Sequence, residues 1–149
     1  MLILREGKLV QSGSPRKILD QPANIDVARL LGVFNLVPCE IRALDPSRNT
    51  SKIQMGDVEL DGPYFPGRFK GDRVTLCVRP EQLVVTARLG RPEPNQIAAE
   101  LKRAVEKPYG MRLEFENGIF ADMGQAAFER LRDNSDWLIE FPAGALRVL

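Results

Sequence analysis

Histidine is absent from this 149-residue sequence. It is the commonest general base in enzymes and the usual proton acceptor for a serine or cysteine nucleophile, so its absence excludes those routes to catalysis. Catalysis by carboxylates or lysine stays open, but no arrangement of these residues indicates it. We therefore expect that this chain is not an enzyme.

The sequence also lacks an excess of either charge. Its 21 lysines and arginines stand against 20 aspartates and glutamates, which gives a formal net charge of +1. Proteins that bind nucleic acids usually carry a basic excess or stripe. Lys107, Tyr109 and Arg112 offer groups that single strands contact, but few aromatic residues fall on faces expected to be exposed. We expect no nucleic-acid partner, and a nucleic-acid-binding OB domain is kept as an alternative that the charge disfavours.

Long hydrophobic runs and cysteines are scarce as well. No stretch of about 18 apolar residues occurs, so we expect no insertion into a membrane. Charged residues come too early for a signal peptide, which predicts a cytoplasmic location.

Cys39 and Cys77 each lie in an apolar run, which favours buried free thiols over a disulfide. Without histidine they do not supply the four ligands of a structural zinc ion, and we predict no metal and no cofactor in this chain.

The pattern that is present changes near residue 33. Before it, residues 2–11 are predicted to form a hairpin, and residues 15–20 and 25–31 two short helices. Ser14 and Asn24 precede these helices as typical N-caps. A glycine at position 32 is placed to end the second helix. These features predict a small α/β segment, residues 1–33.

From Asn35 onward, apolar and polar residues alternate with the period of two that is typical of half-buried strands. In the first such strand Val37, Cys39, Ile41 and Ala43 are expected to share the buried face. Hairpins are predicted at 53–60 and 111–122, further strands at 73–78, 83–86, 97–105, 137–141 and 145–149, and helical turns at 125–132. Many short strands separated by turns favour a mainly β fold, a barrel or a sandwich, for residues 34–149.

An internal echo lies within this β part. "DRVTLCVRPEQLVV" and "DWLIEFPAGALRVL" each read as strand, proline, short break and strand. Two β halves, 34–88 and 95–149, are therefore considered. A chance similarity of strand patterns explains the echo as well as a duplication does.

The stretch "GKLVQSGSPRKILDQPANIDVARLLG" at residues 7–32, followed by "NL", resembles the C-terminal end of the ATP-binding subunit of bacterial ABC importers. In that family a strand with a glycine turn leads into two short helices joined by a Pro-Ala-Asn turn. The residues that fall on this pattern are Gly7, Gln11, Gly13, Pro15, Ile18, Pro22, Ala23, Asn24, Val27, Leu31, Gly32 and Asn35.

That family continues into a regulatory domain of the TOBE (transport-associated OB) type, in which a strand typically ends in "VRPE". This chain has that signature at 78–81, around Pro80. The resemblance implies an OB-like β-barrel with a regulatory and dimerisation role in the import of a small solute. It also implies a homodimer formed through the β domain, and an ATPase core and permease as partners at the inner membrane.

The catalytic motifs of the same family are missing. No Walker A loop G-x-x-x-x-G-K-[S/T] occurs, and the LSGGQ signature, the Walker B pair and the switch histidine are also absent. In the family these motifs precede the stretch at residues 7–32. We therefore expect the C-terminal part of a longer ATPase, made as a fragment or encoded as a truncated gene, with ATP and magnesium belonging to the parent protein.

Four charged residues are candidates for a ligand site: Arg79 and Glu81 in the signature, and Arg68 and Lys70 in a glycine-containing loop. Arginine pairs well with oxyanions, and some importers that this chain resembles carry molybdate or sulfate. An oxyanion-binding domain for molybdate, tungstate or sulfate is therefore the alternative function. The competing interpretation is structural: Arg79 and Glu81 pair to fix the corner at Pro80, and the loop is a solvated turn.

Overall fold

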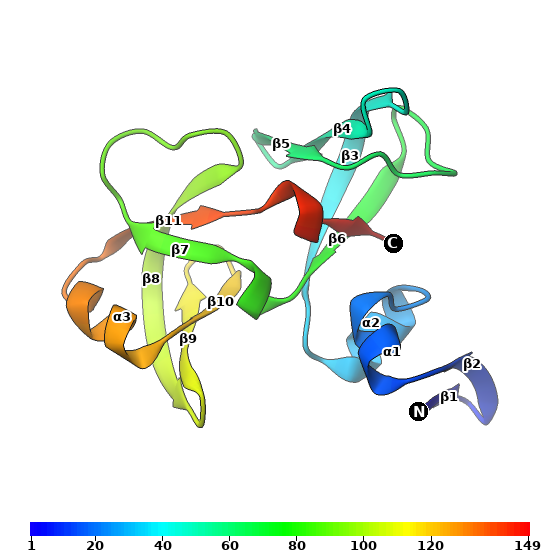
Figure 1. The fold of residues 1–149 in the computed structure, drawn as a ribbon, viewed down its shortest axis with the longest axis horizontal. Helices are drawn as coiled ribbons and strands as arrows, with labels where there is room; N and C mark the ends of the chain where they lie inside the picture. Colours follow the sequence, from blue (N-terminus) through cyan, green and yellow to red (C-terminus); the bar gives the residue numbers. More distant parts are fainter.

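The computed structural model describes residues 1–149 and is mainly β, as the alternation predicted (Figure 1). The strands are β1 (Leu2–Arg5), β2 (Lys8–Ser12), β3 (Asn35–Asp45), β4 (Thr50–Met55), β5 (Val58–Gly62), β6 (Arg73–Val78), β7 (Val84–Ala87), β8 (Gln96–Lys107), β9 (Gly110–Phe115), β10 (Phe120–Met123), β11 (Asp136–Glu140) and β12 (Arg147–Val148). The helices are α1 (Pro15–Asp20), α2 (Ile25–Leu31) and α3 (Gln125–Leu131), with 3-10 turns η1 (Pro80–Gln82) and η2 (Ala143–Ala145). None of the helices is long and apolar enough to cross a membrane.

Beyond the hairpin β1–β2, the strands form two five-stranded antiparallel sheets (Figure 1). The first sheet has the order β12-β6-β3-β4-β5 and the second the order β7-β11-β8-β9-β10. Each half of the β part gives its last strand to the other sheet, because β7 follows β6 but pairs with β11, and β12 follows β11 but pairs with β6. The two sheets are therefore intertwined.

The two halves share irregular features as well as strand order. A β-bulge places an extra residue in β3 at Arg42 and in β8 at Lys102. Each lies seven residues after an asparagine, Asn35 in the first half and Asn95 in the second. The turn η1 packs against β10, and η2 packs against β5. The two echoing stretches thus occupy equivalent positions, β6–η1–β7 and β11–η2–β12. The limits of the two β halves, 34–88 and 95–149, stay a prediction.

The bulge in β3 corrects one expectation. The alternation predicts Ala43 on the buried face with Ile41, but Ala43 is exposed, and Leu44 packs against the core instead. The extra residue at Arg42 shifts the alternation by one, so every later side chain of the strand changes face.

One hydrophobic core joins the two sheets. It contains 22 buried residues, and none of them comes from residues 1–33. Trp137 is completely buried at its centre. The indole lies edge-on to Phe115 and stacked on Phe128, with ring centroids 6.4 Å apart in both pairs. Residues 34–149 are therefore one packing unit, here called the β unit.

In residues 1–33, here called the N-terminal segment, the buried hydrophobic side chains include Ile18, Val27 and Ala28, and none of these belongs to the core of the β unit. The predicted caps are present: Ser14 accepts a hydrogen bond from the Lys17 amide (3.2 Å) and Asn24 accepts one from the Val27 amide (3.0 Å). In Figure 1 the segment lies to one side of both sheets.

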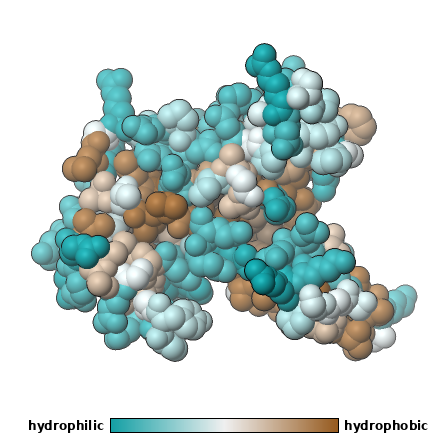
Figure 2. Space-filling view, in the orientation of Figure 1, coloured by the Kyte–Doolittle hydropathy of each residue, from teal (hydrophilic) through white to brown (hydrophobic).

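The surface of the N-terminal segment is unusually apolar at its outer end, where Figure 2 shows hydrophobic side chains gathered at the hairpin. Leu2, Leu4 and Leu9 are 66%, 56% and 58% exposed. The pairing of Leu4 with Leu9 puts these three side chains on one face of the hairpin. This face has no covering layer within the chain.

Both cysteines are free and buried, as predicted. Burial raises the pKa of the Cys39 and Cys77 thiols from 9.0 to about 11. We expect DTNB to react with them at pH 8 only as fast as the protein opens, because the thiolate is the reactive form. The free energy of unfolding should fall as pH rises from 9.0 to about 11. In this range the thiols lose their protons in the unfolded chain but keep them in the folded one. Immediate labelling of the folded protein at pH 8 would contradict this burial.

Candidate functional site: a groove between the two sheets

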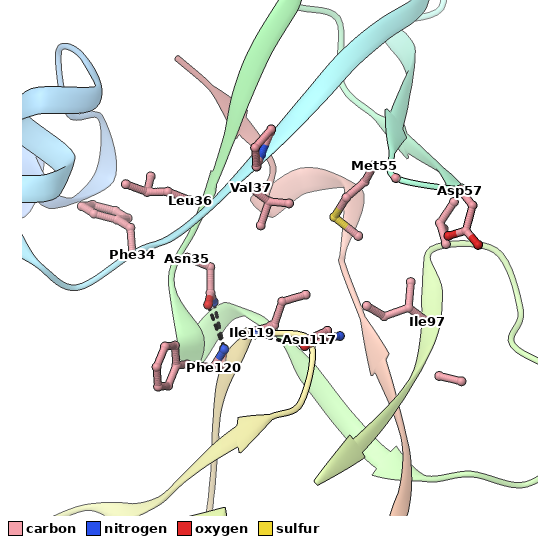
Figure 3. A pocket seen from close by; sticks show the side chains of 15 residues that line it. Phe34, Asn35, Leu36, Val37, Met55, Asp57, Ile97, Asn117, Ile119 and Phe120 are labelled. Carbon is pink, nitrogen blue, oxygen red and sulfur yellow. Dashed lines mark hydrogen bonds between the residues drawn. The ribbon is translucent and has the colours of Figure 1, made fainter. Parts of the chain in front are cut away.

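The largest concavity is a groove of about 700 Å³ between the two sheets (Figure 3). Its walls come from corresponding parts of both halves. The first half supplies residues 34–38 at the start of β3 and 55–58 at the β4–β5 turn, and the second half supplies 97–98 in β8 and 117–120 at the β9–β10 turn. The groove therefore lies where the two equivalent halves meet.

Asn35 joins the halves at the floor of this groove. Its side chain is almost completely buried, with 4% of the residue exposed. The side-chain Nδ2 donates to the Phe120 carbonyl oxygen and Oδ1 accepts from the Phe120 amide, both at 2.8 Å (Figure 3). One carboxamide thus satisfies both main-chain groups of a residue in the edge strand β10, as a neighbouring strand would.

Asn95 makes the corresponding link in the opposite direction. Its Nδ2 donates to the Asp61 carbonyl oxygen in β5, and its Oδ1 accepts from the Asp61 amide, both at 2.8 Å. Nδ2 also donates to the Phe141 carbonyl oxygen at 2.7 Å. Asn95 has a φ of +64°, a region that asparagine tolerates better than most residues. We call Asn35 and Asn95 the two amide clamps.

The lining of the groove is apolar. Nine of its fifteen residues are hydrophobic, and Asp57 is the only charged one. Asp57 forms no ion pair. Asn117, at the opposite turn, uses its Oδ1 to accept from the Ile119 amide at 3.0 Å. Such a lining suits contact with another apolar surface and provides no pair of groups for proton transfer.

The predicted pair Arg79 and Glu81 lies outside this groove, at the corner after β6. Arg79 Nε is 3.4 Å from Glu81 Oε1, and Nη2 is 3.2 Å from Asp20 Oδ1 in α1. The Arg79 amide also donates to Gln82 Oε1 at 3.0 Å, which fixes the turn that begins at Pro80. These contacts support the structural interpretation of the signature.

A second ion pair lies beside this corner. Arg112 binds Asp122 through two hydrogen bonds of 2.8 and 3.0 Å. The hydrogen bond to the Asp122 carboxylate raises the pKa of the Arg112 guanidinium. Arg79, Glu81, Arg112 and Asp122 line one cleft of about 480 Å³, and their charges cancel. An anion would compete there with carboxylates that are already in place.

The other two predicted ligand residues separate in the structure. Arg68 lines a cleft of about 620 Å³ together with Arg147, which the sequence did not single out. Lys70 is exposed and lies outside that cleft. The loop itself is a turn in which the Phe69 amide donates to Asp72 Oδ2 at 2.8 Å. The structure therefore brings Arg68 together with Arg147 and not with Lys70.

The residues shared with the importer pattern have structural roles in the N-terminal segment. Gln11 donates to the Gln21 carbonyl oxygen (3.0 Å) and accepts from the Ala23 amide (2.8 Å), so it holds the hairpin to the Pro-Ala-Asn turn. Pro22 is buried at that turn. Gly7, Gly13 and Gly32 have positive φ, and Pro15 begins α1.

Comparison with solved structures supports the fold. The cytoplasmic molybdate-binding protein ModG matches with a TM-score of 0.65, over 76% of this chain and 94% of that one. The sequences are 12% identical over this match, so it shows the fold alone. The β unit therefore has the OB-like architecture of TOBE domains.

Comparison with curated proteins identifies relatives. The spermidine/putrescine import ATP-binding protein PotA of Ruegeria pomeroyi is 31% identical over 142 residues, 95% of this chain and 36% of that protein. PotA of Nitratidesulfovibrio vulgaris is 31% identical over 72% of this chain and 29% of its own length. The Fe(3+) ions import ATP-binding protein FbpC of Agrobacterium fabrum is 29% identical over 65% of this chain and 26% of its own length. No protein-family profile matches the chain.

The chain is thus homologous to the C-terminal region of the ATP-binding subunits of bacterial ABC importers, as the motif at residues 7–32 predicted. It spans only 26% to 36% of the length of these three relatives.

Proposed function

We propose that this chain is the regulatory and dimerisation part of the ATP-binding subunit of an ABC importer for a small solute. The observation that carries the proposal is the likeness to such subunits over 95% of the chain. ATP, magnesium and the permease are assigned to the complete subunit and transporter, and the chain to the cytoplasmic face of the inner membrane. No reaction step is assigned to these residues.

In this proposal the N-terminal segment packs against the ATPase core through the exposed face of Leu2, Leu4 and Leu9. A two-stranded hairpin is marginally stable by itself, so a covering partner would stabilise it. The β units of two copies pair and hold the two ATPase cores in register. A ligand or partner regulates the pair only if it binds one state of the transporter more tightly than the other.

We assign the groove to the contact between two β units. Its lining is apolar and carries one charge, as the core of a stable interface does. Corresponding parts of both halves form its walls, and in an isologous dimer this same surface of both copies would form the contact. Phe120 lies at the groove and is 37% exposed, available to a partner.

Replacing Phe120 with alanine should therefore weaken self-association by about tenfold or more, because aromatic anchors dominate interface energies. The main-chain hydrogen bonds of Phe120 to Asn35 do not need its ring. The matched control is Phe69→Ala, since Phe69 is 71% exposed and lies outside the groove. Sedimentation velocity over a concentration series measures both variants, and equal weakening by both would count against the groove as the interface.

The parentage has a separate test. Sequencing the DNA upstream of the Met1 codon should reveal an open reading frame that encodes a Walker A loop and an ATPase core. An unrelated frame, or a stop codon directly upstream with no ATPase gene beside it, would argue against this part of the proposal.

Oxyanion binding is the second candidate function. Two observations favour it: the matching fold of ModG is that of a molybdate-binding protein, and Arg68 shares a cleft with Arg147. Titration with molybdate, tungstate and sulfate should raise the melting temperature if the folded chain binds them. No shift with any of them at constant ionic strength would exclude this function.

A further inference from the structure

The cleft that contains Arg68 separates the N-terminal segment from the β unit. On one side it is lined by residues 21–26, the Pro-Ala-Asn turn and the start of α2. On the other side it is lined by Arg68 and by residues 147–149, which include β12. Its volume is about 620 Å³. Anything bound in it would touch both parts of the chain.

The cleft has an excess of positive charge. No carboxylate, that of Leu149 included, lies within 4.0 Å of the guanidinium of Arg68 or Arg147. The one acidic side chain in the lining, Asp26, is already paired with Arg5. Arg68 and Arg147 therefore share the cleft with one unpaired carboxylate, the C-terminal group of Leu149, which leaves an excess of one positive charge.

The arginines also keep donors available. Arg147 donates from Nη1 to the Gly144 and Leu146 carbonyl oxygens, at 3.4 and 3.0 Å. The other two nitrogens of its guanidinium, Nε and Nη2, make no hydrogen bond. Arg68 makes no side-chain hydrogen bond within the chain. Free guanidinium donors are the groups that recognise the oxygens of phosphate and sulfate.

The joint between the two parts is otherwise weak. The ion pair of Arg79 with Asp20 is the only hydrogen bond or ion pair between residues 1–33 and residues 34–149. The Asp20 side chain is 48% exposed, and exposed ion pairs contribute little. The hydrophobic core also stops at the β unit. A ligand in the cleft would therefore add a substantial second connection.

We propose that Arg68 and Arg147 bind a tetrahedral oxyanion of the phosphate or sulfate class in this cleft, and that the bound anion fastens the N-terminal segment to the β unit. This rests on the second candidate function, oxyanion binding, and gives it a site and a consequence. In the complete subunit the anion would control how firmly the β unit is held to the part of the chain that precedes it.

The test uses the whole chain with inorganic phosphate, sulfate and molybdate, at an ionic strength kept constant with sodium chloride. Calorimetry should show binding that weakens about tenfold to a hundredfold in Arg68→Gln and in Arg147→Gln, because each removes a charge-assisted contact. Arg130→Gln is the matched control, since Arg130 is exposed on α3 and forms no ion pair. Its affinity should equal that of the wild type.

A second measurement reports the fastening itself. Trypsin cleavage after Arg16 and Lys17 should slow severalfold when the anion is added to the wild type, and should not slow in Arg147→Gln. If an oxyanion binds equally well to the wild type and to both cleft variants, the site is wrong while oxyanion binding stands. If no oxyanion binds at all, both the site and the second candidate function are wrong, and dimerisation is unaffected.

Discussion

Asn35→Ala should lower the free energy of unfolding by about 2–4 kcal/mol, since it leaves a buried amide and a carbonyl without partners. The side chain makes both of its hydrogen bonds to one residue, Phe120, and is almost completely buried. Because β3 and β10 belong to different sheets, the loss would loosen the connection between the two halves. Chemical denaturation followed by the fluorescence of the single tryptophan measures this effect.

The control for this prediction is Asn134→Ala. Asn134 is exposed, and its side chain makes one local hydrogen bond, to the Leu131 carbonyl oxygen. It should change stability by about 0.5 kcal/mol or less, as surface substitutions usually do. Equal effects of the two substitutions would contradict the amide clamp.

Asn35→Asp separates the two hydrogen bonds of the clamp. The introduced carboxylate still accepts from the Phe120 amide but faces the Phe120 carbonyl oxygen, to which Asn35 donates. Burial and this contact should raise its pKa above the ordinary value of about 3.9. The variant should therefore be most stable relative to the wild type below about pH 4, and lose that stability as pH rises through the raised pKa. A pH-independent difference would argue against Asn35 Nδ2 as the donor to the Phe120 carbonyl oxygen.

Phe115→Ala should lower the free energy of unfolding by about 3–5 kcal/mol. Phe115 is 1% exposed and contacts the indole of Trp137 edge-on, inside the core shared by both sheets. Removing the ring leaves a cavity that rigid strands on both sides cannot fill. Thermal unfolding by circular dichroism measures the loss.

Phe69→Ala is the matched control, because Phe69 is 71% exposed. Its melting temperature should stay within a degree or two of the wild type, whereas that of Phe115→Ala should fall by about 10 °C or more. A small effect of Phe115→Ala would contradict the packing of this ring against Trp137 in the core.

The local structure is predictable because local chemistry determines it. Ser14 and Asn24 are cap residues directly before helices, and the structure uses both as caps. Alternation of apolar residues identifies the strands from Asn35 onward. The structural interpretation of the VRPE signature makes it a corner, and the contacts of Arg79 with Glu81 and Asp20 support that role.

The long-range features are not predictable from local patterns. The bulge at Arg42 shifts the alternation without a glycine or proline to mark it. The amide clamps depend on Asn35 meeting β10 and Asn95 meeting β5, and nothing near either asparagine specifies a partner so distant in sequence. Likewise Arg147 joins Arg68 only because β12 crosses to the first sheet. The internal echo is the one signal in the sequence that points toward the exchange of strands.

The proposal that this chain is a dimerisation module is tested most directly by sedimentation equilibrium of the unmodified chain. We predict that the mass rises with concentration from the 16.7 kDa of one chain toward twice that value and then stops. A mass that stays at 16.7 kDa up to several hundred micromolar would contradict it.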